Sequence, residues 1–287
     1  MANIREIRDR IKGVKNTQQI TKAMKMVSVS KLRKTQLSMN AMRAFTQQCQ
    51  QLMFSLLDSE AAVEHPLMNR RNPEGMITYV VVVANRGLCG AYNTNLVRYL
   101  EKILKEQTRP YQVVVVGRWT SEVLSRMPVV RTFDGFPDTP GPEDCMQITE
   151  YLRQIYLSGQ TEEIQIVYEH FVNVITQVPS VFGILPVQLP EDQQTQPGAD
   201  YCFEPNREEL IDKTVELYLS STVYQLLLEA RTGEHSARIT AMGTATDNTE
   251  ELIAELSLEL NRARQAQITT EISEIAGGAA ALGHKKS

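Results

Sequence analysis

Apolar residues recur every three or four positions near the N-terminus, and this spacing predicts a long amphipathic helix over residues 1–60. A polar, threonine-containing stretch at residues 16–21 interrupts the pattern, so we expect that stretch to face something other than a tightly packed apolar partner. The spacing is typical of a coiled-coil seam, formed here by Ile4, Ile7, Ile11, Val14, Met24, Val27, Met42, Phe45, Cys49, Leu52 and Leu56.

The C-terminal segment, residues 206–283, has a second helical pattern with smaller inward residues. These candidates are Ala237, Ala241, Ala245, Leu252, Leu256, Ala263 and Ala266. All twelve prolines lie between Pro66 and Pro205, so neither terminal segment contains a helix-breaking proline. Helices of this length cannot bury their apolar stripes against one small globule, so the two are predicted to pack together as a long antiparallel coiled coil.

The middle of the chain has the pattern of buried parallel strands alternating with helices. Near-continuous apolar runs predict strands at residues 76–84, 111–117 and 163–171, and helices are expected at residues 93–107, 119–126 and 143–157. This alternation predicts βαβ units and a Rossmann-like α/β head over residues 75–190. Turn-forming residues place its boundaries near residues 61–75 and 190–200.

Composition places the 287-residue chain among globular proteins, with 42% hydrophobic and 22% charged residues. No apolar stretch approaches the roughly 20 residues that a membrane span needs, and the first ten residues are too charged for a secretory signal. We therefore expect a cytoplasmic protein. The cysteines have wide, unequal spacings that favour reduced thiols over disulfides or a zinc site: Cys49, Cys89, Cys145 and Cys202.

Charge is distributed unevenly along the chain. Residues 1–43 carry eleven basic side chains against two acidic ones, whereas residues 247–274 carry seven acidic against two basic. The charges are consistent with attraction between the two terminal helices, with a solvated polar face, or with an acidic protein or nucleic acid as partner. A pI of about 5.7 argues against nucleic acid.

The motif with the most chemical interest is the turn Arg86-Gly87-Leu88-Cys89-Gly90, which follows a predicted strand. A glycine turn that leads into a helix can bind phosphate, but this one lacks the spacing of a dinucleotide or P-loop motif, which favours a structural turn. Cys89 has no histidine nearby in sequence, and the four histidines are too dispersed for a metal cluster. We expect no catalytic, cofactor or metal site.

The terminal segments also carry long motifs. These are IREIRDRIKGVKNTQQITKAMKMVSVSKLRK at residues 4–34, EHSARITAMGTATDN at residues 234–248 and NRARQAQITTEISEIAGGA at residues 261–279. The last contains the pattern I-T-x-E-x-x-E-x-x-x-G-A, formed by Ile268, Thr269, Glu271, Glu274, Gly278 and Ala279. With RGLCGAYN in the middle of the chain, these motifs resemble, from end to end, the gamma subunit of F-type ATP synthases.

The resemblance implies a non-catalytic central rotor shaft in a proton-translocating ATP synthase. In that family the paired terminal helices turn inside a ring of three alpha and three beta subunits, while the head rests on epsilon and the membrane c-ring. The shaft transmits torque between the c-ring and the catalytic beta subunits and so regulates ATPase activity and proton flow. The implied location is peripheral, on the cytoplasmic face of the bacterial cell membrane, with no cofactor and no nucleic acid.

Residue roles follow only where the motifs match. Met24, beside Lys22 and Lys25, resembles the position that meets an acidic lever of beta, and Arg238 resembles the opposing shaft residue. The other implied contacts are the polar collar gripped by beta loops (Arg264, Gln265 and Thr269), the foot against epsilon and the c-ring (Tyr201, Phe203 and Glu204) and a weakly polar tip at residues 275–282.

Three departures from the family pattern limit this transfer. Asn85 stands where the family usually has an acid, and Gly243 stands where a larger helix former is common. The head has no paired cysteines, so we expect no thiol switch like that of chloroplast gamma subunits. The alternative is a coiled-coil adaptor or nucleic-acid-binding regulator that dimerises through its arms and binds DNA in a salt-dependent way.

Overall fold

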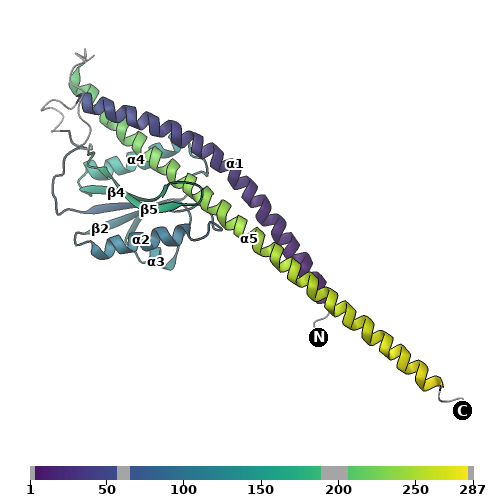
Figure 1. Cartoon of the computed structure of the whole chain (residues 1–287). Coiled ribbons are helices and arrows are strands. Elements are labelled where there is room, and N and C mark those ends of the chain that lie inside the picture. The colour runs from purple at the N-terminus through teal and green to yellow at the C-terminus, as the bar shows by residue number, and fades with distance from the viewer. Residues whose placement is uncertain (1–3, 57–64, 189–205, 284–287) are drawn as a thin grey trace. The chain divides into compact units, whose positions relative to one another are not determined.

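A computed structural model describes residues 4–56, 65–188 and 206–283 of the chain (Figure 1). The elements are α1 (Ile4–Leu56), β1 (Ile77–Val82), α2 (Tyr92–Glu106), β2 (Tyr111–Val116), α3 (Glu122–Ser125), β3 (Val129–Phe133), α4 (Pro142–Leu157), β4 (Glu163–Phe171), β5 (Gln177–Leu185) and α5 (Arg207–Gly283). The two long terminal helices, of 53 and 77 residues, are confirmed. Neither contains proline.

The head is a five-stranded sheet in the order β3-β2-β1-β4-β5. The first four strands are parallel, while β5 pairs antiparallel with β4. Helices α2 and α3 connect the parallel neighbours β1/β2 and β2/β3, and α4 carries the chain from β3 across the sheet to β4. The Rossmann-like α/β head is thereby confirmed.

Each face of the sheet is covered by its own apolar core. On one face, residues of β1 and β2 such as Val81 and Val115 pack with Leu96 and Leu100 of α2 and Leu124 of α3. On the other face, the strands pack against α4, the end of α1 and the first part of α5 (Figure 1). Every residue of β1 is buried, which explains why its sequence is a continuous apolar run instead of an alternating one.

The sequence did not predict the two edge strands. Strand β3 is short and mostly exposed, so it lacks the apolar run that marked its neighbours. Strand β5 contains Pro179 and Gly183, both of which are unfavourable inside a strand and read as loop residues. Pairing with β4 along eight positions supplies the order that the local sequence does not indicate.

The buried seam of α1 differs in part from the predicted one. Phe45 and Leu52 are 45% and 41% exposed, whereas Thr46 and Met53 are 7% and 1% exposed. The prediction was wrong at these positions because it stepped by three where the structure steps by four. Both spacings place residues on one face of a helix, so the choice depended on the partner surface.

Packing divides the chain into two units, residues 1–26 with 241–287 and residues 27–240. In the first, α1 and α5 run antiparallel: the hydroxyls of Thr21 and Thr246 are 2.9 Å apart, and the Cβ position of Gly243 lies 3.5 Å from Lys25 Nζ. Thr21 is therefore buried against α5 through a polar contact, and residues 16, 17, 19 and 20 are exposed, which agrees with the expectation that residues 16–21 lack a tightly packed apolar partner. In the second unit, Arg43 of α1 pairs with Glu229 of α5 at 2.6 Å.

The predicted division into segments 1–60, 75–190 and 206–283 as domains stays a prediction.

We expect Gly243→Ala to stabilise the chain by about 1 kcal/mol, because alanine is the better helix former. The new Cβ would meet only the flexible end of Lys25, at ordinary van der Waals distance. Thermal unfolding of the purified chain measures the change. Gly13→Ala is the matched control, since nothing lies within 4 Å of its Cβ position and it reports helix propensity alone. A loss of stability at Gly243 with a gain at Gly13 would show that Lys25 cannot yield.

Candidate partner interface

The first group of predicted contact residues lies on α1. Lys22 is exposed, while Met24 and Lys25 are half-buried. Lys22 continues an exposed basic stripe, with Lys15 and Arg8 each one seven-residue step earlier. Like charges along one helix face repel each other, so this stripe is suited to a negatively charged partner surface.

The second group lies on the last part of α5. Arg264, Gln265 and Thr269 are all exposed, and the Thr269 hydroxyl donates to the Gln265 carbonyl oxygen at 2.9 Å. The same segment exposes three isoleucines at steps of four and three residues: Ile268 (46%), Ile272 (61%) and Ile275 (73%). An exposed apolar stripe of this kind marks a contact surface. Sequence reasoning missed Ile272, although its spacing from the other two was visible.

Arg238 has a different environment, in the unit of residues 27–240. The residue is 7% exposed, and its Nη2 donates to Glu234 Oε1 at 2.7 Å, to the Arg86 carbonyl oxygen at 3.1 Å and to the Gly87 carbonyl oxygen at 3.4 Å. Its guanidinium therefore holds the Arg86–Gly90 turn of its own chain. Any contact of Arg238 with a partner remains a prediction.

The Arg86–Gly90 turn is shaped by two residues of positive φ, Leu88 at 62° and Gly90 at 60°. Two of its carbonyl oxygens accept from Arg238, and Cys89 is 3% exposed. Burial raises the pKa of the Cys89 thiol above its ordinary value. This environment favours the predicted role of Cys89 as a small core residue and is unfavourable for a nucleophile.

The other thiols follow the same pattern where the structure describes them. Cys49 and Cys145 are free and buried, and burial raises the pKa of each. Cys202 and the predicted foot residues Tyr201, Phe203 and Glu204 lie outside the described residues.

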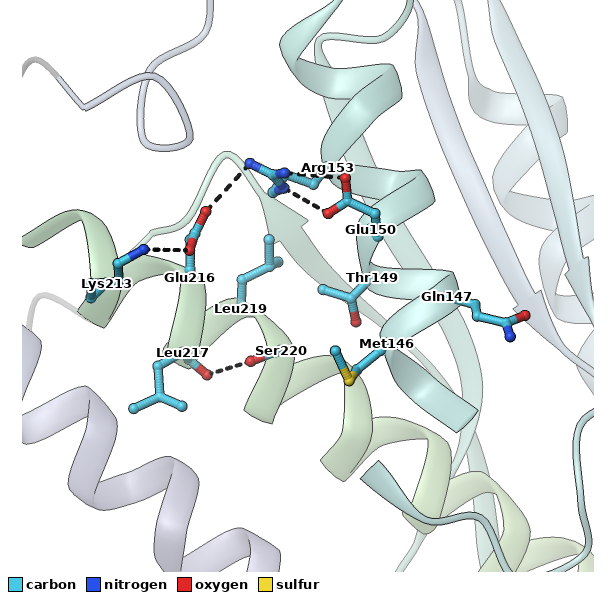
Figure 2. A pocket seen from close by; sticks show the side chains of 10 residues that line it. All are labelled: Met146, Gln147, Thr149, Glu150, Arg153, Lys213, Glu216, Leu217, Leu219 and Ser220. Carbon is cyan, nitrogen blue, oxygen red and sulfur yellow. Dashed lines mark hydrogen bonds and ion pairs between the residues drawn. The ribbon is translucent and has the colours of Figure 1, made fainter. Parts of the chain in front are cut away.

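A hollow of about 630 Å³ lies between α4 and the first part of α5 (Figure 2). Met146, Leu217 and Leu219 supply apolar lining, and charged side chains line its other end. Arg153 binds both Glu150 oxygens, at 3.0 and 3.1 Å, and reaches Glu216 at 3.3 Å. Because these charges already neutralise one another, the hollow offers no group poised for catalysis.

The residues that the structure describes hold neither a candidate metal site nor a membrane-spanning helix. No three histidine, cysteine, aspartate or glutamate side chains among them gather in a way that could hold a metal ion. None of the helices, over the residues described, is apolar enough for its length to cross a bilayer.

Comparison with known proteins gives concordant matches. Residues 3–282 match the family model described as ATP synthase. The chain is 42% identical over 284 residues to the ATP synthase gamma chain of Desulfitobacterium hafniense, covering 98% of this chain and 100% of that one. It is 40% identical to the ATP synthase gamma chain of Symbiobacterium thermophilum, covering 98% of each.

A solved structure supports the same fold. A chain from the Euglena gracilis mitochondrial ATP synthase, in a structure of OSCP, F1 and c-ring, aligns with a TM-score of 0.70 at 21% identity, covering 99% of this chain and 96% of that one.

Proposed function

Since the chain belongs to the ATP synthase gamma family, it is a non-catalytic rotor-shaft subunit of that complex, and we propose that it carries torque between a membrane c-ring and catalytic beta subunits. The observation that carries this is the match to gamma chains along nearly the whole length of both sequences. Under this function the chemistry belongs to other subunits, and the chain contributes surfaces and stiffness. We place it peripherally on the cytoplasmic face of the membrane.

The two exposed surfaces suit different partner contacts. The segment of Lys22, Met24 and Lys25 meets an acidic segment of beta, and Lys22 extends this contact to the basic stripe that it forms with Lys15 and Arg8. The isoleucine stripe, with Arg264, Gln265 and Thr269, turns inside the upper ring of alpha and beta subunits. The foot, Tyr201, Phe203 and Glu204, contacts epsilon and the c-ring.

The rotor can change the state of its partner subunits because α1 and α5 expose different surfaces. A shaft changes the state of a subunit only if each orientation binds one state better than another. A helix with a basic stripe and a helix with an apolar stripe provide such a difference at each angle of rotation. The alternative of a coiled-coil adaptor or nucleic-acid-binding regulator is not favoured, because the family match spans residues 3–282.

Met24→Lys tests the acidic contact. The half-buried site lies beside Lys25, so a lysine here would add a second positive charge to the same contact. The acidic segment of beta would then bind the shaft too strongly in one orientation of the shaft, and this would hinder its release. We expect a complex with three alpha, three beta and one gamma subunit to form normally. ATP-driven proton transport should fall by about tenfold, as expected for roughly 1.4 kcal/mol of excess binding, while ATP hydrolysis falls less.

The measurement compares ATPase and proton transport of the co-expressed complex in the same membranes. Gln48→Lys adds the same charge at an exposed position of α1, 24 residues further along the helix and outside the basic stripe, and serves as the control. Equal losses in both variants would contradict the acidic contact. A chain that forms no complex with alpha and beta but dimerises and binds DNA would overturn the rotor function itself.

A further inference from the structure

A buried ionic cluster joins α5 to the head within the unit of residues 27–240. We call its three members, Arg231, Glu234 and Arg238, the α5 clamp. Glu234 is 1% exposed, and its two oxygens accept from Arg231 Nη1 at 2.5 Å and from Arg238 Nη2 at 2.7 Å. Burial alone would raise the pKa of Glu234, but the two guanidinium groups outweigh it and hold the pKa below its ordinary value. The carboxylate is therefore ionised between two cations.

The arginines of the clamp also hold the segment that follows β1. Arg231 Nη1 donates to the Val83 carbonyl oxygen at 3.2 Å, and Arg231 Nη2 donates to Asn85 Oδ1 at 3.1 Å. Arg238, four residues beyond Glu234, binds the two carbonyl oxygens at the start of the Arg86–Gly90 turn. One face of α5 thus contacts four of the five residues from 83 to 87.

Asn85 extends the network to the loop after β3. Its Nδ2 donates to the Phe136 carbonyl oxygen at 2.5 Å and lies 3.5 Å from Asp138 Oδ1. Asp138 forms an ion pair with Lys31 of α1, and its carbonyl oxygen lies 2.9 Å from His235 Nε2 of α5. Both long helices are therefore tied to the same edge of the sheet.

The presence of asparagine at position 85 fits this network. Asp138 is half-buried, and this partial burial alone would raise its pKa, but Lys31, followed by Asn85 and Arg86, lowers that pKa to about 2. A second carboxylate at position 85 would stand beside this ionised group and would lose both amide donations. The amide can accept from Arg231 and donate toward Asp138 at once, so it links a cation to an anion.

A buried ionic cluster is a poor source of net stability compared with apolar packing. It differs from apolar packing in being directional, because its hydrogen bonds weaken steeply when donor and acceptor are misaligned. Apolar contacts between a helix and a sheet have no such directionality, so they resist sliding and twisting of the helix less. Fixed hydrogen bonds to backbone carbonyls are therefore suited to keeping α5 from turning about its own axis against the head.

We propose that the α5 clamp, with Asn85, is a torque lock that prevents α5 from twisting relative to the head while the rotor is under load. The proposal rests on the rotor function proposed above. In this role Arg231, Glu234 and Asn85 are positioning residues that act on stiffness and not on the affinity for any ligand. Weakening the lock should leave unloaded ATP hydrolysis near its normal rate. It should increase the range of angles over which the head fluctuates relative to α5.

The test uses the complete complex, with the alpha and beta ring fixed to a surface and a gold particle attached to the head. Arg126→Cys, directly after α3, gives an exposed attachment point in a Cys202→Ser background, since Cys49, Cys89 and Cys145 are buried. The angular variance of the particle is measured while the rotor pauses for ATP. We expect Glu234→Gln to raise this variance by about twofold or more, as loss of a coupling element should.

Glu163→Gln is the matched control. Glu163 also belongs to a partly buried ion cluster, but it lies at the start of β4, and both of its ion pairs, with Arg70 and Arg109, are outside α5. If Glu234→Gln does not assemble, Asn85→Ala removes the outer contacts and keeps the Arg231–Glu234–Arg238 pairing, and the same rise is expected. Variance equal to that of the unsubstituted complex, or equal rises in variant and control, would overturn the lock. An unsubstituted complex that does not rotate would instead overturn the rotor function.

Discussion

Replacing Gly117 by alanine is expected to destabilise the chain by about 3 kcal/mol or more, enough to leave little folded protein. Gly117 follows β2 with φ at +124°, a conformation that side-chain-bearing residues rarely adopt. A Cβ at this position would lie 2.3 Å from the Val83 carbonyl oxygen and 2.9 Å from its carbonyl carbon. Val83 cannot easily yield, because its amide donates to the Val116 carbonyl oxygen at 2.9 Å and the Gly117 amide donates to the Phe133 carbonyl oxygen at 2.9 Å.

Thermal unfolding and the yield of folded chain measure this effect. Gly183→Ala is the matched control, since Gly183 lies within β5 and nothing approaches its Cβ position within 4 Å. We expect that variant to be close to neutral. An unfolding temperature for Gly117→Ala within the range of the control would show that the sheet can open at Val83 without cost. The Val83 carbonyl also accepts from Arg231, so the substitution is expected to disturb the α5 clamp as well.

The parts of the fold that were predictable have local causes. The apolar runs of β1, β2 and β4 are each visible within a few residues, and the absence of proline from both terminal segments is read directly from the sequence. The edge strands β3 and β5 are not, because they owe their order to a neighbour. The α1 seam shows the same limit, since Phe45 and Thr46 both fit a helical repeat and only the packing partner distinguishes them.

The α5 clamp illustrates what sequence reasoning missed. Arg231, Glu234 and Arg238 have the spacing of one helix face, and in the structure that face is buried, which is unusual for charged residues. That spacing could have been read as a buried ion cluster. Its acceptors near Val83 and Asn85 are about 150 positions away in the sequence, and only the βαβ topology brings them to α5.

The predicted interface residues on α1 and α5 came from motifs and not from local chemistry. Composition gave only a charge asymmetry with several interpretations, whereas the motifs selected Met24, Arg264 and Thr269 individually. The motifs gave no indication that Arg238 is buried, because sequence alone does not distinguish an arginine on a partner surface from one that grips its own chain.

Glu169→Gln is expected to stabilise the chain above neutral pH. Glu169, on β4, is 2% exposed, and its Oε2 has no hydrogen-bond partner among the residues described. Burial is the cause that raises the pKa of this carboxyl from its ordinary value of 4.5 to about 7. The folded chain therefore holds a proton that the unfolded chain releases between those values. The associated stability is fully present below about pH 4.5 and is lost as pH rises through about 7, a total of roughly 3 kcal/mol.

Glutamine has nearly the same shape and no charge, so the variant should not lose this stability. The measurement is thermal or denaturant unfolding of both chains at about pH 5 and about pH 8.5. We expect similar stability at the lower pH and a more stable variant at the higher one. Glu163→Gln, on the same strand, removes a carboxylate paired with Arg70 and Arg109 and is expected to lower stability at high pH. The opposite signs follow from one physical difference: Glu163 is buried with two cations, whereas Glu169 is buried without a cation in contact among the residues that the structure describes. An unchanged pH dependence in Glu169→Gln would show that water or a structural change already compensates the buried charge.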